Sequence, residues 1–150
     1  KDLKQSTQMA PADAIAHYQL GKVLYKLNQF TLAMESYNKA LSLNPGLTDV
    51  YYDRALVFQD LKDYGNARMD FEVITLQQPA NKGKAHYHIA QIYAIEQKKT
   101  QMMAQLKLAQ KSKYFDIQGN KVLLKTDPSF DAFKNDADFR KWMATVMKVK

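Results

Sequence analysis

The chain has 150 residues, 46% of them hydrophobic, and carries a formal net charge of +7 with no cysteine. A chain of this length can bury a core, and the lack of cysteine excludes a disulfide framework, a thiolate zinc site and a cysteine nucleophile. No apolar run approaches the roughly 20 residues that cross a bilayer, and nothing resembles a signal peptide, so we expect a soluble protein that is cytoplasmic or periplasmic.

Three prolines, Pro11, Pro45 and Pro79, lie 34 residues apart. This period extends upstream of Ala14. On the same register Leu3, Ser6 and Met9 occupy the large, small and large positions of a second helix. We therefore expect residues 1–13 to form a half-repeat or an N-terminal cap helix.

The segment 14–47 has the spacing of two helices joined by a turn. Leucines at helical spacing form a stripe beside Gly21, where a second helix can approach closely. Asn44-Pro45-Gly46 ends the second helix, because proline has no amide hydrogen to continue the helix. The residues that define the pattern are His17, Leu20, Gly21, Leu24, Ala33, Tyr37, Ala40 and Pro45.

Two more segments repeat this pattern. In the segment 48–81, Arg54 departs from it, because it stands where Leu20 stood; in the segment 83–115, no proline closes the pattern and Met102 replaces a small residue. The matching positions are Tyr51, Ala55, Phe58, Tyr64, Ala67, Phe71, Ile74 and Pro79, and then His86, Ile89, Ala90, Tyr93, Leu106 and Ala109.

These segments resemble the tetratricopeptide repeat family, whose pattern W-x2-L-G-x2-Y…A-x3-F…P has a period of about 34 residues. His17 stands where the pattern has tryptophan, and Leu24 where it has tyrosine. The resemblance implies an all-α, right-handed α-solenoid of stacked antiparallel helix pairs, with a concave groove lined by the first helix of each pair. It also implies a binding scaffold rather than an enzyme.

The repeat period ends near Lys113, and residues 116–150 are expected to form C-terminal capping helices. Thr126-Asp127-Pro128 indicates a helix stop followed by an N-cap. Asp136 is expected to cap a last helix. This tail resembles the one that closes many bacterial tetratricopeptide domains, and we expect it to cover the third repeat. The apolar stripe of the last helix comprises Phe139, Trp142, Met143, Val146 and Met147.

If the family geometry applies, the groove carries a tyrosine at the fifth position of every repeat. These are Tyr18, Tyr52 and Tyr87. They either contact a bound peptide or pack between neighbouring helices. Capture of a chaperone's C-terminal carboxylates is disfavoured, since Asp53 would repel them. The predicted groove residues are Tyr18, Lys22, Tyr25, Tyr52, Asp53, Gln59, Lys84, Tyr87, His88 and Gln91.

The positive charge lies in the last third of the chain. Residues 1–97 have ten basic and ten acidic residues, whereas residues 98–150 have twelve and five. An alternative function is therefore docking of this region on an anionic surface, membrane or nucleic acid. Such lysines more often form a solvated helix face, and the scarcity of arginine argues against nucleic acid. The predicted basic patch comprises Lys107, Lys111, Lys113, Lys121 and Lys125.

No catalytic set is evident. His17 and His86 share an inward position, and His86 and His88 are two residues apart, which does not suit a metal-binding helix face. We expect no enzyme activity, cofactor, metal or small-molecule substrate. The expected partner is a protein or peptide; self-association and continuation of a longer solenoid are left open.

Overall fold

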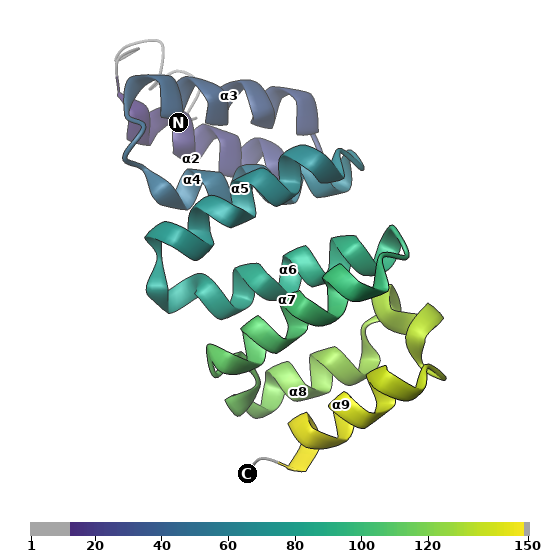
Figure 1. Ribbon diagram of the computed structural model, residues 1–150. Helices are drawn as coiled ribbons and strands as arrows, with labels where there is room; N and C mark the ends of the chain where they lie inside the picture. Colours follow the sequence, from purple (N-terminus) through teal and green to yellow (C-terminus); the bar gives the residue numbers. More distant parts are fainter. Residues whose placement is uncertain (1–12, 149–150) are drawn as a thin grey trace. The chain divides into compact units, whose positions relative to one another are not determined.

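The computed structural model describes residues 13–148, and within them every regular element is helical (Figure 1). The predicted half-repeat at residues 1–13 lies, except for Asp13, outside these described residues. The chain divides into two compact units, with the boundary between Gln77 and Gln78. No described helix is long and apolar enough to cross a membrane.

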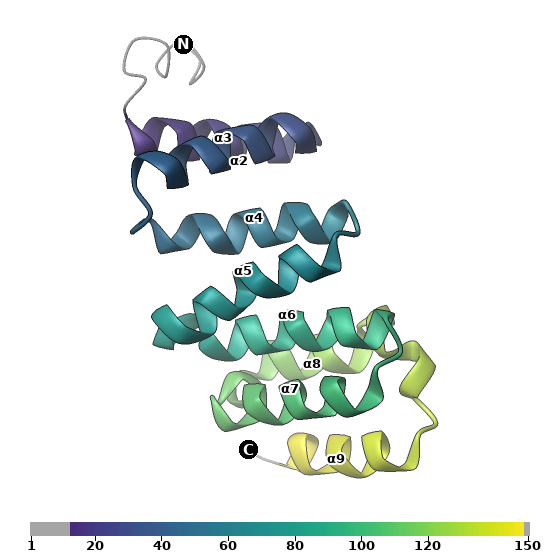
Figure 2. The same cartoon turned by 45° about the horizontal axis from the view of Figure 1, so that its top comes forward.

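The first unit contains two helix pairs (Figure 2). Helix α2 (Ala14–Lys26) packs on α3 (Phe30–Leu43), and α4 (Thr48–Asp60) packs on α5 (Tyr64–Gln77). As expected, α3 ends before Pro45, where Asn44 adopts an extended conformation. Helices α3 and α4 also contact each other, so the two pairs stack.

The turn inside each helix pair has the same backbone geometry. Asn28, Lys62 and Gln97 are left-handed, with φ of 58°, 61° and 58°. The residue after each of them returns its amide to the carbonyl five residues earlier, at 2.8 to 2.9 Å. The repeat period predicted from side chains is thus also present in the backbone.

The close approach predicted at Gly21 is confirmed. A Cβ atom placed there would lie 2.5 Å from the ring of Tyr37, which is 1% exposed. Ala33, Ala40 and Val57 complete the core around this ring. The tyrosine therefore fills the space left by the missing side chain, and the α2–α3 pair packs tightly because of it.

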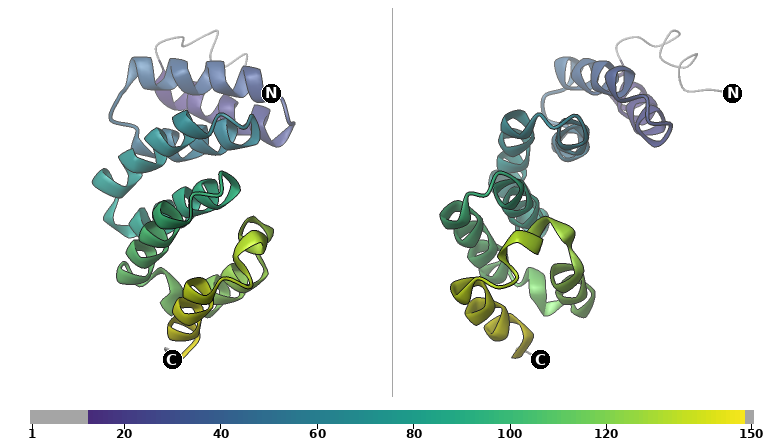
Figure 3. Two further views of the ribbon diagram at one scale, coloured as in Figure 1. Left: turned by 45° about the vertical axis from the view of Figure 1, so that its right-hand side comes forward. Right: turned by 90° about the vertical axis from the view of Figure 1, so that its right-hand side faces the viewer.

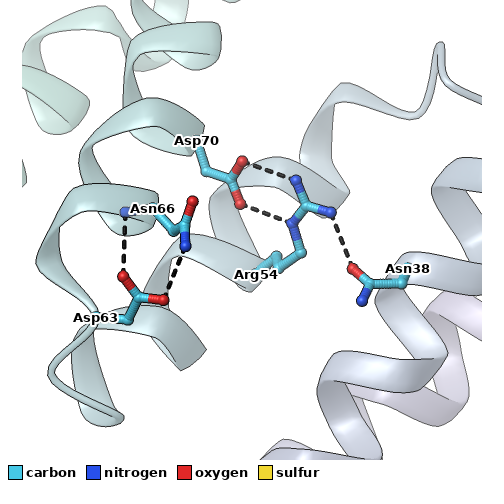
Figure 4. A network of polar contacts seen from close by, with 5 residues as sticks. All are labelled: Asn38, Arg54, Asp63, Asn66 and Asp70. Carbon is cyan, nitrogen blue, oxygen red and sulfur yellow. Dashed lines mark hydrogen bonds and ion pairs between the residues drawn. The ribbon is translucent and has the colours of Figure 1, made fainter.

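Arg54, which departs from the pattern, is part of a polar network within the first unit (Figure 4). Its guanidinium group donates two hydrogen bonds to Asp70, at 2.7 and 2.8 Å, and a third to Asn38 at 2.9 Å. The Asp70 side chain is only 7% exposed. The charged residue is accommodated because α5 supplies a carboxylate at the facing position.

The second unit contains one helix pair and the C-terminal tail, which folds back over that pair in Figure 3. After η1 (Pro79–Asn81), helix α6 (Lys82–Ile95) packs on α7 (Lys99–Lys111). The tail comprises η2 (Tyr114–Asp116), α8 (Gln118–Thr126), η3 (Pro128–Phe133) and α9 (Ala137–Lys148).

The tail and the α6–α7 pair share one hydrophobic core. Leu106 of α7 packs in the same cluster as Phe130 and Trp142 of the tail. Both predicted caps are present: Asp127 accepts the amide of Ser129 at 2.9 Å, and Asp136 accepts the amide of Phe139 at 3.0 Å. The tail therefore covers the α6–α7 pair by packing into its core.

Candidate protein-binding face

The face predicted to bind a partner is formed, in the first unit, by the first helix of each pair. Tyr18, Lys22 and Tyr25 lie four and three residues apart on α2, so they share one side of that helix. Tyr52 and Gln59 are seven residues apart on α4 and also share a side. Because α2 and α4 contact each other, we call these residues together with Asp53 and Asp60 the α2–α4 face.

Two equivalent hydrogen bonds join the helices across this face. The Tyr18 hydroxyl donates to Asp53 at 2.7 Å, and the Tyr25 hydroxyl donates to Asp60 at 2.6 Å. In each bond the aspartate lies 35 residues after the tyrosine, which is one position beyond the tyrosine's equivalent in the following repeat. The sequence analysis missed these bonds, although a tyrosine followed 35 residues later by an aspartate, twice, is a signal that could have revealed them.

The tyrosines of the face remain protonated at neutral pH. Burial and the hydrogen bonds to Asp53 and Asp60 raise the pKa of Tyr18 and Tyr25 well above the usual value. Burial, with a smaller effect of Asp53, raises the pKa of Tyr52 to about 12. The hydroxyls are therefore permanent donors, which keeps the carboxylates fixed in place.

The accessible part of the face combines aromatic rings and charge. The rings of Tyr18 and Tyr25 are half-buried, and the ammonium group of Lys22 lies 5.3 Å from the centre of the Tyr18 ring. Gln59 is half-buried and Asp60 is exposed. The first unit thus presents fixed tyrosines whose carboxylate partners lie at a surface that a ligand could reach.

Tyr87, the third predicted member of the tyrosine ladder, lies in the second unit and differs from the expectation. It is 1% exposed, and its hydroxyl donates to Asp127 of the tail at 2.6 Å. Rings of Tyr114, Phe115 and Phe130 surround it. Tyr87 therefore packs inside the protein instead of lining an open groove, because the tail covers this part of α6.

Of the other predicted residues of α6, one contacts the tail and one is exposed to solvent. Gln91 donates to Asp127 at 2.6 Å, while Lys84 is exposed. His88 is half-buried, and its Nδ1 lies 2.9 Å from the side-chain oxygen of Gln91. Burial lowers the pKa of His88 to about 4, so the ring is neutral at pH 7.

One of the five residues of the predicted basic patch is buried. Lys107, Lys111, Lys113 and Lys125 are exposed, but Lys121 is only 5% exposed. Lys121 therefore differs from the expectation, because α8 turns this side chain toward the protein. Among the described residues, no group of three or more histidine, cysteine, aspartate or glutamate side chains is arranged to hold a metal ion.

Comparison with known proteins identifies the repeat. The family model for the tetratricopeptide repeat matches residues 14–47. A search of curated proteins found no match.

Solved structures of MamA share the fold. The structure described as MamA 41-end from Desulfovibrio magneticus RS-1 is 22% identical with a TM-score of 0.77, and the match covers 98% of this chain and 81% of that one. The MamA RS-1 ArsTM double mutant gives the same identity and TM-score, with 98% and 80% covered. A further crystal structure of MamA is 21% identical with a TM-score of 0.69, covering 75% of this chain and 65%, less than two thirds, of that one. With the helix pairs and their repeated turns, these findings show an all-helical solenoid fold that contains a tetratricopeptide repeat at residues 14–47.

Proposed function

We propose that this protein is a non-catalytic scaffold that binds a segment of a partner protein on the α2–α4 face. The tetratricopeptide repeat and the fold shared with the MamA structures support an interaction role. The observation that carries the choice of face is the pair of hydrogen bonds from Tyr18 to Asp53 and from Tyr25 to Asp60.

These bonds support binding because they fix the face before a partner arrives. A tyrosine held by its hydroxyl loses little further freedom when a ligand packs on its ring, so less entropy opposes binding. The same bonds hold two carboxylates at the surface. The proposed partner segment therefore carries apolar side chains for the rings and at least one lysine or arginine for the carboxylates.

The alternative, docking of the lysine-rich region on an anionic surface, has less support. Lys121 is buried and so cannot contribute to docking, which leaves four of the five predicted lysines exposed. We retain this alternative as an outcome of the experiment. Binding there would depend strongly on salt and would not respond to changes on α2 or α4.

The experiment selects peptides from a phage-displayed random library against the full chain and measures their affinity by fluorescence anisotropy. Asp60→Asn keeps an oxygen to accept the Tyr25 hydrogen bond but removes the charge, so binding should weaken about tenfold. Lys22→Glu adds negative charge to the face, so binding should strengthen. Partial unfolding would weaken binding in both variants, so weaker binding in one and stronger binding in the other would have to come from the charge on this face.

Two exposed positions on the second helices supply matched controls. Lys39→Glu on α3 and Glu72→Gln on α5 change charge by the same amounts, and both residues are exposed. They should leave the affinity unchanged, and circular dichroism should show equal helix content in all variants. Equal affinity in all four variants would mean that the partner binds elsewhere.

A further inference from the structure

The last helix has a second stripe of side chains that the core does not use. Phe139, Trp142 and Val146 point into the protein and are 3%, 7% and 1% exposed. Beside them, Arg140, Met143, Ala144 and Met147 follow the helical spacing i, i+3, i+4 and i+7. Met143 is half-buried and Met147 is 38% exposed, so this second stripe faces a space that other side chains only partly fill.

That space is a groove of about 300 Å³ within the second unit. Leu124 of α8 and Phe130 of η3 line it together with the two methionines, and both are 2% exposed. We call this site the tail groove; it is lined by Leu124, Lys125, Asp127, Phe130, Lys134, Phe139, Arg140, Met143, Ala144 and Met147.

The rim of the tail groove is positively charged. Lys125, Lys134 and Arg140 line it, and all three are exposed, but Lys134 is paired with Asp131 at 2.7 Å. Asp127 is the single carboxylate of the lining; it is 6% exposed, and its oxygens accept hydrogen bonds from Tyr87, Gln91 and the amide of Ser129. Lys125 and Arg140 therefore supply the positive charge that a ligand at the rim would meet.

We propose that the tail groove binds a helical segment of a partner protein, with apolar side chains on one face and acidic side chains beside them. Methionine side chains adapt to different apolar shapes, as in other grooves that bind amphipathic helices. The basic rim matches acidic flanks. Within residues 13–148 there is no strand edge to pair with an extended peptide, whereas a helix satisfies its own backbone groups.

Two other ligand classes fit the groove less well. A membrane surface would be expected to meet an exposed tryptophan, but Trp142 is 7% exposed and donates its indole hydrogen to Gln110 at 2.8 Å. Single-stranded nucleic acid would need exposed aromatic faces for base stacking, whereas Phe130 and Phe139 are 2% and 3% exposed. Both classes remain as outcomes of the test.

The probe is a fluorescein-labelled synthetic helix of about 18 residues, with leucines at helical spacing and glutamates on both sides of them. A second peptide has lysine in place of every glutamate. With the full chain, anisotropy should show binding of the glutamate peptide at the tail groove. Any binding of the lysine peptide should occur at the α2–α4 face, weaken in Asp60→Asn and leave the signals of Met143 and Met147 unshifted. Arg140→Glu and Lys125→Glu should each weaken it about tenfold, whereas Lys111→Glu, an exposed change on α7 outside the groove, should not.

Methionine methyl groups report where the peptide binds. With ¹³C-methyl methionine, the NMR signals of Met143 and Met147 should shift on binding. Met34 of α3 and Met103 should not shift; Met103 lines a separate hollow of about 780 Å³ between α7 and α9. The binding should also be unchanged in Asp60→Asn, which separates this site from the α2–α4 face.

Four results would overturn the proposal: no binding of the glutamate peptide, equal shifts of Met143 and Met147 with the lysine peptide, shifts at Met103 or Met34 in place of Met143 and Met147, or unchanged affinity in Arg140→Glu. Vesicles containing phosphatidylserine and a single-stranded oligonucleotide are run in parallel. If either displaces the glutamate peptide and shifts Met143 and Met147 more strongly, the groove belongs to that ligand class instead.

Discussion

Replacing Arg54 by leucine, the residue at the equivalent position of the first repeat, should destabilise the protein. Leu20 and Arg54 are equivalent, and so are Ser36 and Asp70, which face them from the second helix of each pair. Arg54→Leu therefore restores the family pattern at one position but leaves the Asp70 carboxylate, 7% exposed, without its cation. A consensus argument from sequence would predict the opposite sign.

The size of the loss follows from the geometry. The guanidinium group donates to both oxygens of Asp70, at 2.7 and 2.8 Å, and lies 5.4 Å from the ring of Tyr51. Removing one partner of a buried pair costs about 3 kcal/mol.

The decisive variant is the double change Arg54→Leu with Asp70→Ser, which copies the pair found in the first repeat. We expect it to lose only about 1 kcal/mol, since no buried charge remains. The Asp70→Ser change alone should cost about 1 to 2 kcal/mol, because Arg54 is 20% exposed and can turn toward water. Urea unfolding followed by far-UV circular dichroism gives all four free energies of unfolding.

The reasoning is refuted if Arg54→Leu is as stable as the parent, or if the double variant loses the sum of the two single changes.

The remaining predictions concern a glycine, the tail and a histidine. Gly21→Ala should lower the free energy of unfolding by about 1 to 3 kcal/mol, because its Cβ would meet the buried ring of Tyr37. Gly65→Ala, with nothing within 4 Å, should raise it by up to about 1 kcal/mol; equal effects in urea unfolding would contradict this. Asp127→Asn should cost about 2 kcal/mol and expose the single tryptophan, seen as a red shift of its fluorescence, since the buried hydrogen bonds to Asp127 are disturbed. Burial tends to raise the pKa of Asp127, but these hydrogen bonds together lower it. The stabilisation that the Asp127 carboxylate supplies should therefore be present above pH 3.8 and be lost as the pH falls below that value. Burial lowers the pKa of His86, whose Nε2 has no partner, so the unfolded chain binds more protons below pH 6.5. Stability should fall between pH 7 and pH 5, and His86→Gln should reduce that fall.

The helix pairs could be predicted from sequence because each residue used for the prediction contacts its own pair. Gly21 and Tyr37 contact each other within one helix pair, so their spacing in the sequence is enough to predict the contact. The end of α3 at Pro45 is a local backbone effect. Such contacts recur in every repeat, so a pattern of 34 residues contains them.

The candidate site was harder to predict because the positions of its residues depend on contacts with elements outside their own helix pair. The fifth-position tyrosines were expected to form one continuous ladder. Tyr18 contacts the following repeat through Asp53, whereas Tyr87 contacts the tail through Asp127, 40 residues later. Lys121 likewise lies on a helix that belongs to no repeat, so no periodic position indicated its burial.

The tail meets the third repeat with the same chemistry that joins the first repeat to the second. In both cases a fifth-position tyrosine donates its hydroxyl to an aspartate that follows its own helix pair in the chain, at 2.7 Å to Asp53 and at 2.6 Å to Asp127. A last repeat leaves this donor without a following repeat, and a buried donor without a partner is costly. The tail therefore has to place one carboxylate beside the Tyr87 hydroxyl, but it does not have to place a helix at the position that a fourth repeat would occupy. The tail can therefore depart from the repeat period and still satisfy the Tyr87 hydroxyl.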